Sequence, residues 1–368
     1  MLAKRQYGID LLRIISMLMV LVLHVLLKGG ILDRLEPFSA KYYAAWFAEI
    51  VCIGAVNCYA LISGFVSVER KFKYYKIALL WLQVVFYTVA ITLIFAYVLN
   101  YEHTAQDIID SFFPVTSKSY WYFTAYFALF FFCPFLNTML NALNKRQLKI
   151  LFATIFIIFS VIPTIKKIDL FNMANGYSFI WLMMLYLIGG ITKKLQSHNF
   201  KRKNFVFLIL LFFVSVIIGL AFKLYSAKNP DSAITQSYVI GYAFIPNFIS
   251  AYCLFLISVN MDIKSKPIVS IIKFLSPLSF SVYLIHTNPW IWNEIMNKKF
   301  EHYTNLHAFR FVIAVALTVL AIYFICSSID LIRYYLFKLL KLPQRLARLE
   351  ENITNKLHKN EVKIPEEV

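Results

Sequence analysis

The chain has 368 residues, of which 60% are hydrophobic and 17% aromatic, well above the composition of an ordinary soluble domain. Its formal net charge of +18 would suit a nucleic-acid partner, but the basic residues fall in short loops between apolar runs, and no soluble domain is present to carry that function. Composition therefore excludes a soluble enzyme and nucleic-acid binding, and it predicts an all-α, polytopic transmembrane helical bundle.

About ten apolar segments are long enough to cross a bilayer. They are approximately 9–28, 42–67, 77–99, 120–140, 148–165, 177–192, 204–222, 237–260, 272–294 and 308–331. Alternate connecting segments, together with the two ends of the chain, hold 25 of the 37 Lys and Arg residues, so both termini are predicted to be cytoplasmic. We divide the chain into a transmembrane domain, 1–335, and a cytoplasmic tail, 336–368. All five cysteines lie in apolar segments, which predicts buried thiols.

The first span carries Asp10, Arg13 and His24, ionisable groups that a bilayer-spanning helix normally excludes. At about 100° per residue the three share one face of the helix. Asp10 and Arg13 are three residues apart and can pair, whereas Asp10 lies about 21 Å along the axis from His24. Any group that orients the His24 imidazole must therefore come from another helix. Two plainer interpretations stay open: Arg13 as a snorkelling anchor and His24 as a packing residue. The span lacks a small-residue cleavage site, and we expect it to be retained.

The second span contains Asn57 near its middle, where the amide needs a hydrogen-bond partner. Ser63 and Gly64 follow, and they either belong to a site or simply permit close helix packing. The next turn is basic, with Arg70, Lys71, Lys73 and Lys76. Such a turn is an ordinary cytoplasmic loop, and it would also suit the phosphates of a nucleotide-bearing donor.

Later spans add aromatic and histidine residues. Trp121 and Tyr126 begin the fourth span, where an aromatic belt is expected of any membrane helix. His286 in the ninth span lies at a depth similar to that of His24, so the two histidines could line one cavity. No metal site is expected. In the tail from Lys338, leucines at three-to-four spacing predict an amphipathic helix that lies on the membrane or pairs with a second copy of the chain.

Several of these motifs resemble the acyltransferase-3 family of integral membrane O-acyltransferases. The segment Ile9-Asp10-Leu-Leu-Arg13, followed by His24, is similar to the family's opening helix. Its later landmarks resemble, in matching order, Leu61-Ile-Ser63-Gly64-Phe65, Tyr120-Trp121-Phe123 with Pro134-Phe-Leu-Asn137, Tyr186-Leu-Ile-Gly189-Gly190 and Tyr283-Leu-Ile-His286. The resemblance covers about residues 5–330 and all ten predicted spans.

The resemblance implies transfer of an acyl group, usually acetyl from acetyl-CoA, to a hydroxyl of a cell-surface carbohydrate, with no bound cofactor. On that interpretation His24 carries the transfer, as general base or as an acylated relay. We assign donor binding to Arg13, Asp10, Ser63, Arg70, Lys73 and Lys76, and the acceptor or cavity side to Asn57, Trp121, Tyr126 and His286. Many members have an arginine-rich stretch after the Ser-Gly element. Here it holds one arginine and three lysines, which offer point charges instead of planar forks.

The sequence therefore predicts a multi-pass O-acetyltransferase of a bacterial plasma membrane. Its acceptor would be an envelope or capsular polysaccharide or the lipid-linked precursor. One alternative is a transporter or flippase that moves a glycan or acyl group without catalysis, and whose activity would survive His24→Ala. Another is a scaffold within a polysaccharide synthesis complex, for which the amphipathic tail is the only indication.

Overall fold

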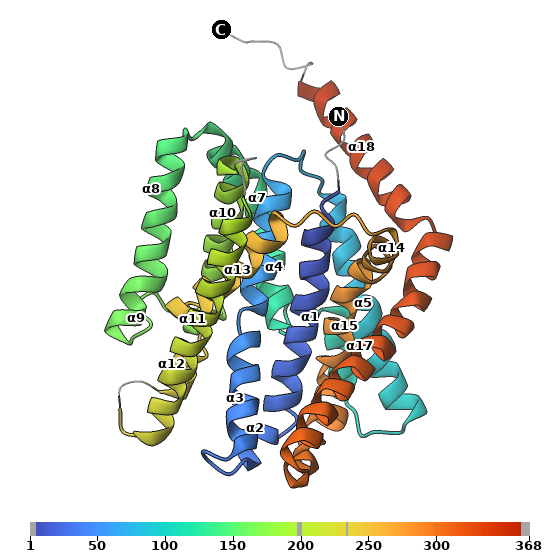
Figure 1. Ribbon diagram of the computed structural model, residues 1–368. Helices are drawn as coiled ribbons and strands as arrows, with labels where there is room; N and C mark the ends of the chain where they lie inside the picture. The colour runs from blue at the N-terminus through green and yellow to red at the C-terminus, as the bar shows by residue number, and fades with distance from the viewer. Residues whose placement is uncertain (1–4, 197–200, 233–234, 362–368) are drawn as a thin grey trace.

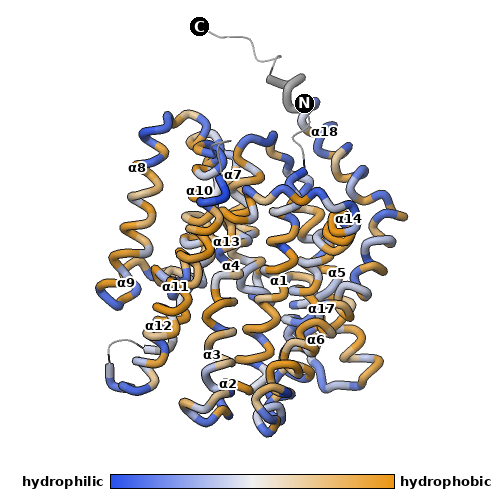
Figure 2. The backbone as a smooth tube through the Cα atoms, in the orientation of Figure 1, coloured by the Kyte–Doolittle hydropathy of each residue, from blue (hydrophilic) through white to orange (hydrophobic). Residues whose placement is uncertain are grey.

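The computed structural model describes residues 5–196, 201–232 and 235–361 and folds them into one bundle of helices (Figure 1). This part of the chain contains no strand, as the all-α prediction requires. Within it, eight helical stretches are long and apolar enough to cross a membrane: Tyr7–Arg34, Ala40–Ser67, Tyr75–Val98, Trp121–Ala142, Lys145–Lys166, Arg202–Lys228, Lys266–His286 and Ala308–Leu339. Hydrophobic residues run through the body of the bundle and hydrophilic residues gather at its two ends (Figure 2). The fold is a polytopic membrane bundle.

Each of the ten predicted spans coincides with helix, but two of these helices are short. α10 (Phe179–Leu195) has 17 residues and α13 (Ile245–Val259) has 15. Helices of that length rise about 22–26 Å, less than the roughly 30 Å of a bilayer's hydrocarbon core. The count of ten crossings and the orientation of the bundle remain predictions.

Helix α1 (Tyr7–Leu27) lies in the centre of the bundle (Figure 1). It is an uninterrupted apolar helix without proline, and it packs against helices from both halves of the chain. These neighbours are α3 (Ala40–Cys52), α4 (Ala55–Ser67), α13, α14 (Lys266–Leu275), α15 (Ser279–His286) and α17 (Ala308–Leu339). Polar side chains on α1 therefore meet protein on several sides.

The remaining helices surround this centre. They are α2 (Ile31–Arg34), α5 (Tyr75–Leu93), α6 (Ala105–Phe112), α7 (Trp121–Ala142), α8 (Lys145–Phe156), α9 (Ile162–Lys166), α11 (Arg202–Lys228), α12 (Gln236–Val239), α16 (Pro289–Ile291) and α18 (Leu342–Glu361). Short 3₁₀ turns occur at Ala174–Gly176, Ser276–Leu278 and Glu301–Asn305, and π-helical turns at Ile94–Val98, Ile157–Val161 and Trp292–Met296. All five cysteines are buried and unbridged, as predicted.

Two glycines allow α4 and α10 to pack with their backbones in contact. A Cβ atom added at Gly64 would overlap the carbonyl of Tyr186 on α10, and one added at Gly189 would overlap the carbonyl of Leu61 on α4. The two contacts are reciprocal. Of the two interpretations left open for the Ser-Gly element, close packing is therefore the one that accounts for Gly64.

The last long helix extends beyond the tenth predicted span. α17 continues to Leu339, past the approximate predicted end at residue 331, and Arg333 on this helix is buried inside the bundle. Arg333 donates hydrogen bonds of 2.7 and 2.8 Å to the two carboxylate oxygens of Asp330, which is fully buried. The carboxylate of Asp330 replaces the water that would otherwise hydrate the guanidinium. The charged pair can therefore be buried within an apolar helix.

Helix α18 then crosses the start of α5. The carboxylate of Glu350 accepts hydrogen bonds of 2.9 and 3.1 Å from the backbone N–H groups of Tyr74 and Tyr75, where α5 begins. Figure 1 shows that α1 begins and α18 ends at the same end of the bundle, uppermost in that view. We call this the upper end; it is the end predicted to be cytoplasmic.

Candidate active site

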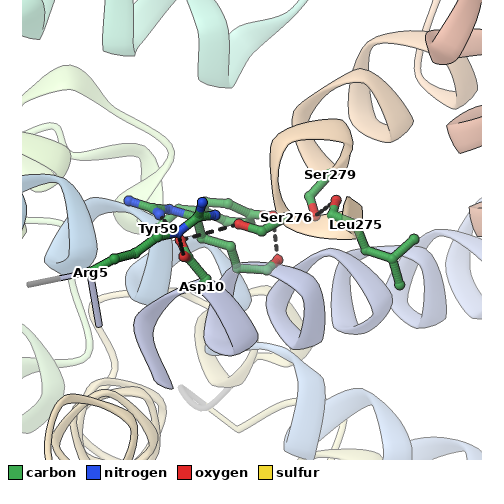
Figure 3. A network of polar contacts seen from close by, with 7 residues as sticks. Arg5, Asp10, Tyr59, Leu275, Ser276 and Ser279 are labelled. Atoms are coloured by element: carbon green, nitrogen blue, oxygen red, sulfur yellow. Dashed lines mark hydrogen bonds and ion pairs between the residues drawn. The ribbon is translucent and has the colours of Figure 1, made fainter. Parts of the chain in front are cut away.

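A network of charged groups occupies the upper end of α1 (Figure 3). The carboxylate of Asp10 is 2.6 Å from Nε of Arg5 and 2.6 Å from Nη1 of Arg13, which is the pairing that the three-residue spacing predicts. Ser276 donates a third hydrogen bond, of 3.3 Å, to the same carboxylate. Asp10 is only 5% exposed, so these partners compensate the loss of its hydration.

The network forms one wall of a cleft of about 600 Å³. Four basic side chains line this cleft against two acidic ones: Arg5, Arg13, Arg70 and Lys193 against Asp10 and Glu69. The excess of positive charge suits an anionic ligand. We refer to this space as the basic cleft.

The basic cleft includes only some of the residues assigned to donor binding. Asp10, Arg13 and Arg70 line it, whereas Lys73 and Lys76 do not. Ser63 also lies outside its lining, beside Tyr126. Sequence reasoning gave Lys193 no role in donor binding, because nothing in the sequence places the end of α10 beside the start of α1.

A second, smaller cavity of about 40 Å³ adjoins His24. Its walls are mostly apolar or aromatic: Met17, Val20, Leu23, His24, Val56, Tyr59, Trp121, Tyr122, Tyr242, Phe280 and Tyr283. Met17, Val20 and His24 continue the face of α1 that begins at Arg13, since they recur at three-to-four spacing. We call this cavity the histidine chamber. It has room for one or two water molecules.

One hydrogen bond joins the walls of the two cavities. Tyr59 on α4 lines the histidine chamber, and its hydroxyl donates a 2.7 Å hydrogen bond to the backbone carbonyl of Arg13, whose side chain lines the basic cleft. Figure 3 shows Tyr59 beside the Asp10 network. Because Tyr59 belongs to one wall and Arg13 to the other, the two cavities are neighbours along α1.

His24 and His286 meet beside the chamber, although 262 positions separate them in the sequence. Nδ1 of His24 is 2.8 Å from Nε2 of His286, and the ring centroids are 5.0 Å apart. Nδ1 of His286 is in turn 2.5 Å from the carbonyl oxygen of Val282. His286 is 1% exposed, while His24 keeps part of its surface accessible. The structure thus brings together the two histidines that the sequence placed at similar depth.

These contacts fix the tautomers of the two rings when both are neutral. The Val282 carbonyl can only accept, so Nδ1 of His286 must carry its proton. Nε2 of His286 is then an acceptor, and Nδ1 of His24 donates to it. The remaining nitrogen of His24, Nε2, keeps its lone pair. The arrangement is that of a base oriented by a second group.

The other residues assigned to the acceptor side have different surroundings. Trp121 lines the histidine chamber and stacks on Tyr242 at 6.0 Å and 18°. Tyr126 lies one layer behind, stacked on Tyr122 at 6.1 Å.

Asn57, which is fully buried, is absent from the chamber wall. It accepts a 2.9 Å hydrogen bond from Nε1 of Trp181 and donates one of 2.9 Å to the carbonyl of Tyr242. Both ends of its amide are therefore engaged in holding the segment that carries Tyr242.

Sequence reasoning missed most of the aromatic wall. Tyr59, Tyr242 and Trp292 belong to apolar segments already rich in aromatic residues, so composition offered no reason to single them out. Trp292 meets the His24 ring edge-on, with centroids 4.7 Å apart and planes at 79°. The one signal was Pro289, which interrupts the ninth span three residues earlier and precedes the π-helical turn that carries Trp292.

Comparison with known proteins places this geometry in a family. A family model described as an acyltransferase domain matches residues 6–327, which include both histidines and every residue that lines the two cavities except Arg5. No curated protein and no solved structure matches the chain.

Proposed function

The chain belongs to the acyltransferase-3 family, and we propose that it is an O-acetyltransferase of a bacterial plasma membrane. It would move an acetyl group from acetyl-CoA in the cytoplasm to a hydroxyl of an envelope or capsular polysaccharide, or of its lipid-linked precursor. The observation that carries the proposal is the position of His24. Its oriented imidazole lies on the same face of α1 as Arg13, one cavity beyond a basic cleft.

The basic cleft suits the nucleotide end of acetyl-CoA. Arg5, Arg13, Arg70 and Lys193 would contact the donor's phosphates, with Asp10 holding two of the arginines in place. From Arg13 the uncharged pantetheine arm would follow the face of α1 for about 16 Å to His24. The histidine chamber is too small for this arm at about 40 Å³, so the donor would have to move Tyr59 or its neighbours.

His24 would supply the base. Nε2 of His24 accepts the proton of the acceptor hydroxyl while the hydroxyl oxygen attacks the thioester carbonyl. The carbon–sulfur bond then breaks, and the CoA thiolate takes the proton from His24. In the relay form of the reaction, Nε2 itself is acylated first and passes the group to the hydroxyl. Both forms require the lone pair that the bond to His286 leaves on Nε2.

Transport without chemistry is the less favoured function. A transporter has no need of an oriented imidazole, so it leaves the contact between His24 and His286 without a purpose. The scaffold alternative still depends on the tail alone.

The test is His24→Ala, expressed in a strain that lacks the chromosomal gene. We expect no O-acetyl groups on the surface glycan and normal amounts of protein in the membrane, because His24 is the proposed base. His302→Ala is the matched control, since His302 is exposed and lies in the 3₁₀ turn Glu301–Asn305. Full O-acetylation by the His24→Ala protein would overturn the mechanism.

A further inference from the structure

The face of α1 that carries Arg13 and His24 continues past His24, away from Arg13. Lys28 lies one turn further along the helix, and its ammonium group is 5.4 Å from the centroid of the Trp292 ring. The same ring meets His24 edge-on. His24 therefore has the histidine chamber on one side and a tryptophan with a lysine on the other, and both Trp292 and Lys28 are partly exposed.

No carboxylate of the described residues lies within ion-pair distance of Lys28. Apart from the contact with Trp292, its ammonium makes a long hydrogen bond, 3.4 Å, to Oδ1 of the exposed Asn293. The same segment carries Lys298 and Lys299, both exposed, and one acidic residue, Glu294, while the next acidic residue, Glu301, pairs with Arg34 at 3.3 Å. We call Lys28 and the segment 292–299 the rim. The rim is positively charged, and Lys28 has no counter-charge in the part of the chain that the structure describes.

Main-chain contacts hold this rim in place. The N–H of Lys298 donates a 2.9 Å hydrogen bond to the carbonyl of Lys28, and the N–H of Phe300 donates one of 3.1 Å to the carbonyl of Gly29. Trp292 itself begins the π-helical turn Trp292–Met296, a distortion that often occurs at functional sites. Trp292 and Lys28 are thus carried by two segments tied to each other beside His24.

We propose that Trp292 and Lys28 form an acceptor subsite for a sugar ring that carries an anionic group, either a carboxylate or a phosphate. The inference rests on the proposed function and names the class of its acceptor. The indole offers an apolar surface with a polar edge, which suits the C–H face of a sugar. The anion in turn supplies the counter-charge that Lys28 lacks. A ring held there would present a neighbouring hydroxyl to His24.

The test is binding of defined saccharides to the full chain in phosphatidylcholine nanodiscs. The probes are an oligogalacturonate with carboxylates, a phosphorylated maltoheptaose, and neutral maltoheptaose. We expect at least one anionic probe to bind more tightly than maltoheptaose, and Lys28→Glu to weaken that binding about tenfold. Trp292→Ala should weaken binding of the same probe. The matched control is Lys228→Glu, because Lys228 is an exposed lysine at the end of α11.

Three results would overturn the subsite. They are equal binding of maltoheptaose and both anionic probes, wild-type affinity in Lys28→Glu, and an equal loss in Lys228→Glu, which would indicate general charge attraction. His24→Ala separates this inference from the proposed function. It should keep the Lys28-dependent binding while losing transfer, so retained transfer would overturn the function and leave the subsite standing.

Discussion

Replacing His286 by leucine tests whether it acts through His24. Leucine fills a similar volume but offers no acceptor for Nδ1 of His24, which now donates a 2.8 Å hydrogen bond to His286. A buried N–H left without a partner costs about 1–3 kcal/mol, so the productive tautomer of His24 becomes less favourable by that amount. Because each 1.36 kcal/mol is tenfold in rate, kcat should fall about 5- to 160-fold. His286→Gln should lose less, since its amide oxygen can accept the same hydrogen bond.

The assay is the initial rate of CoA release in membranes of a deletion strain complemented with each allele, because the proposed lipid-linked acceptor would stay in such membranes. A positioning role lowers kcat and leaves the KM for acetyl-CoA unchanged. His103→Leu serves as the control at an exposed histidine. An unchanged kcat in His286→Leu would refute the tautomer argument. So would equal losses in the leucine and glutamine variants, because they would indicate a role in packing alone.

Two further predictions concern the donor site and the packing of the bundle. Arg13→Lys should raise the KM for acetyl-CoA several-fold with normal insertion, because lysine cannot keep the 2.6 Å contact to Asp10 and also present a planar fork to a phosphate. An unchanged dependence of the rate on acetyl-CoA concentration would contradict this assignment. Gly64→Ala should destabilise the detergent-solubilised protein by about 1–3 kcal/mol in thermal unfolding, because its methyl group would overlap the carbonyl of Tyr186. Gly219→Ala should cost less, since its nearest neighbour is the end of the Ile50 side chain, and equal losses would argue against backbone contact as the cause.

The parts of the site that share one helix could be predicted from the sequence. A regular helix fixes the angle and rise between Asp10, Arg13 and His24, so their common face and the pairing of the first two follow from spacing. The same geometry excluded Asp10 as the partner of His24. It also indicated that the partner would come from another helix, and His286 does so.

Contacts between distant segments could not be predicted in this way. Nothing in the spacing of residues shows that the carbonyl of Leu61 lies against Gly189, or that the amide of Asn57 is engaged by Trp181 and Tyr242. These contacts depend on how helices are arranged, and one sequence indicates periodicity within a helix but not the register between two.

Arg333 shows a related limit. Its charge, taken alone, predicts a cytoplasmic residue. The deciding feature is Asp330, three residues earlier, whose carboxylate pairs with the guanidinium and allows both groups to be buried. The spacing of the pair is visible in the sequence, but the burial of both side chains depends on the helices packed around them.

The order of polarity along α1 constrains how a donor can bind under the proposed function. Between the start of α1 and His24, charge is confined to the basic cleft, where Asp10 lies between two arginines. The described residues that line the histidine chamber include no carboxylate and no guanidinium. Moving an unpaired charge into such a chamber would cost several kcal/mol or more. The phosphates of acetyl-CoA must therefore stay at the cleft, and only the uncharged arm with its thioester can reach His24. The cost of burying charge thus decides which end of the donor enters the chamber, before any specific contact is made.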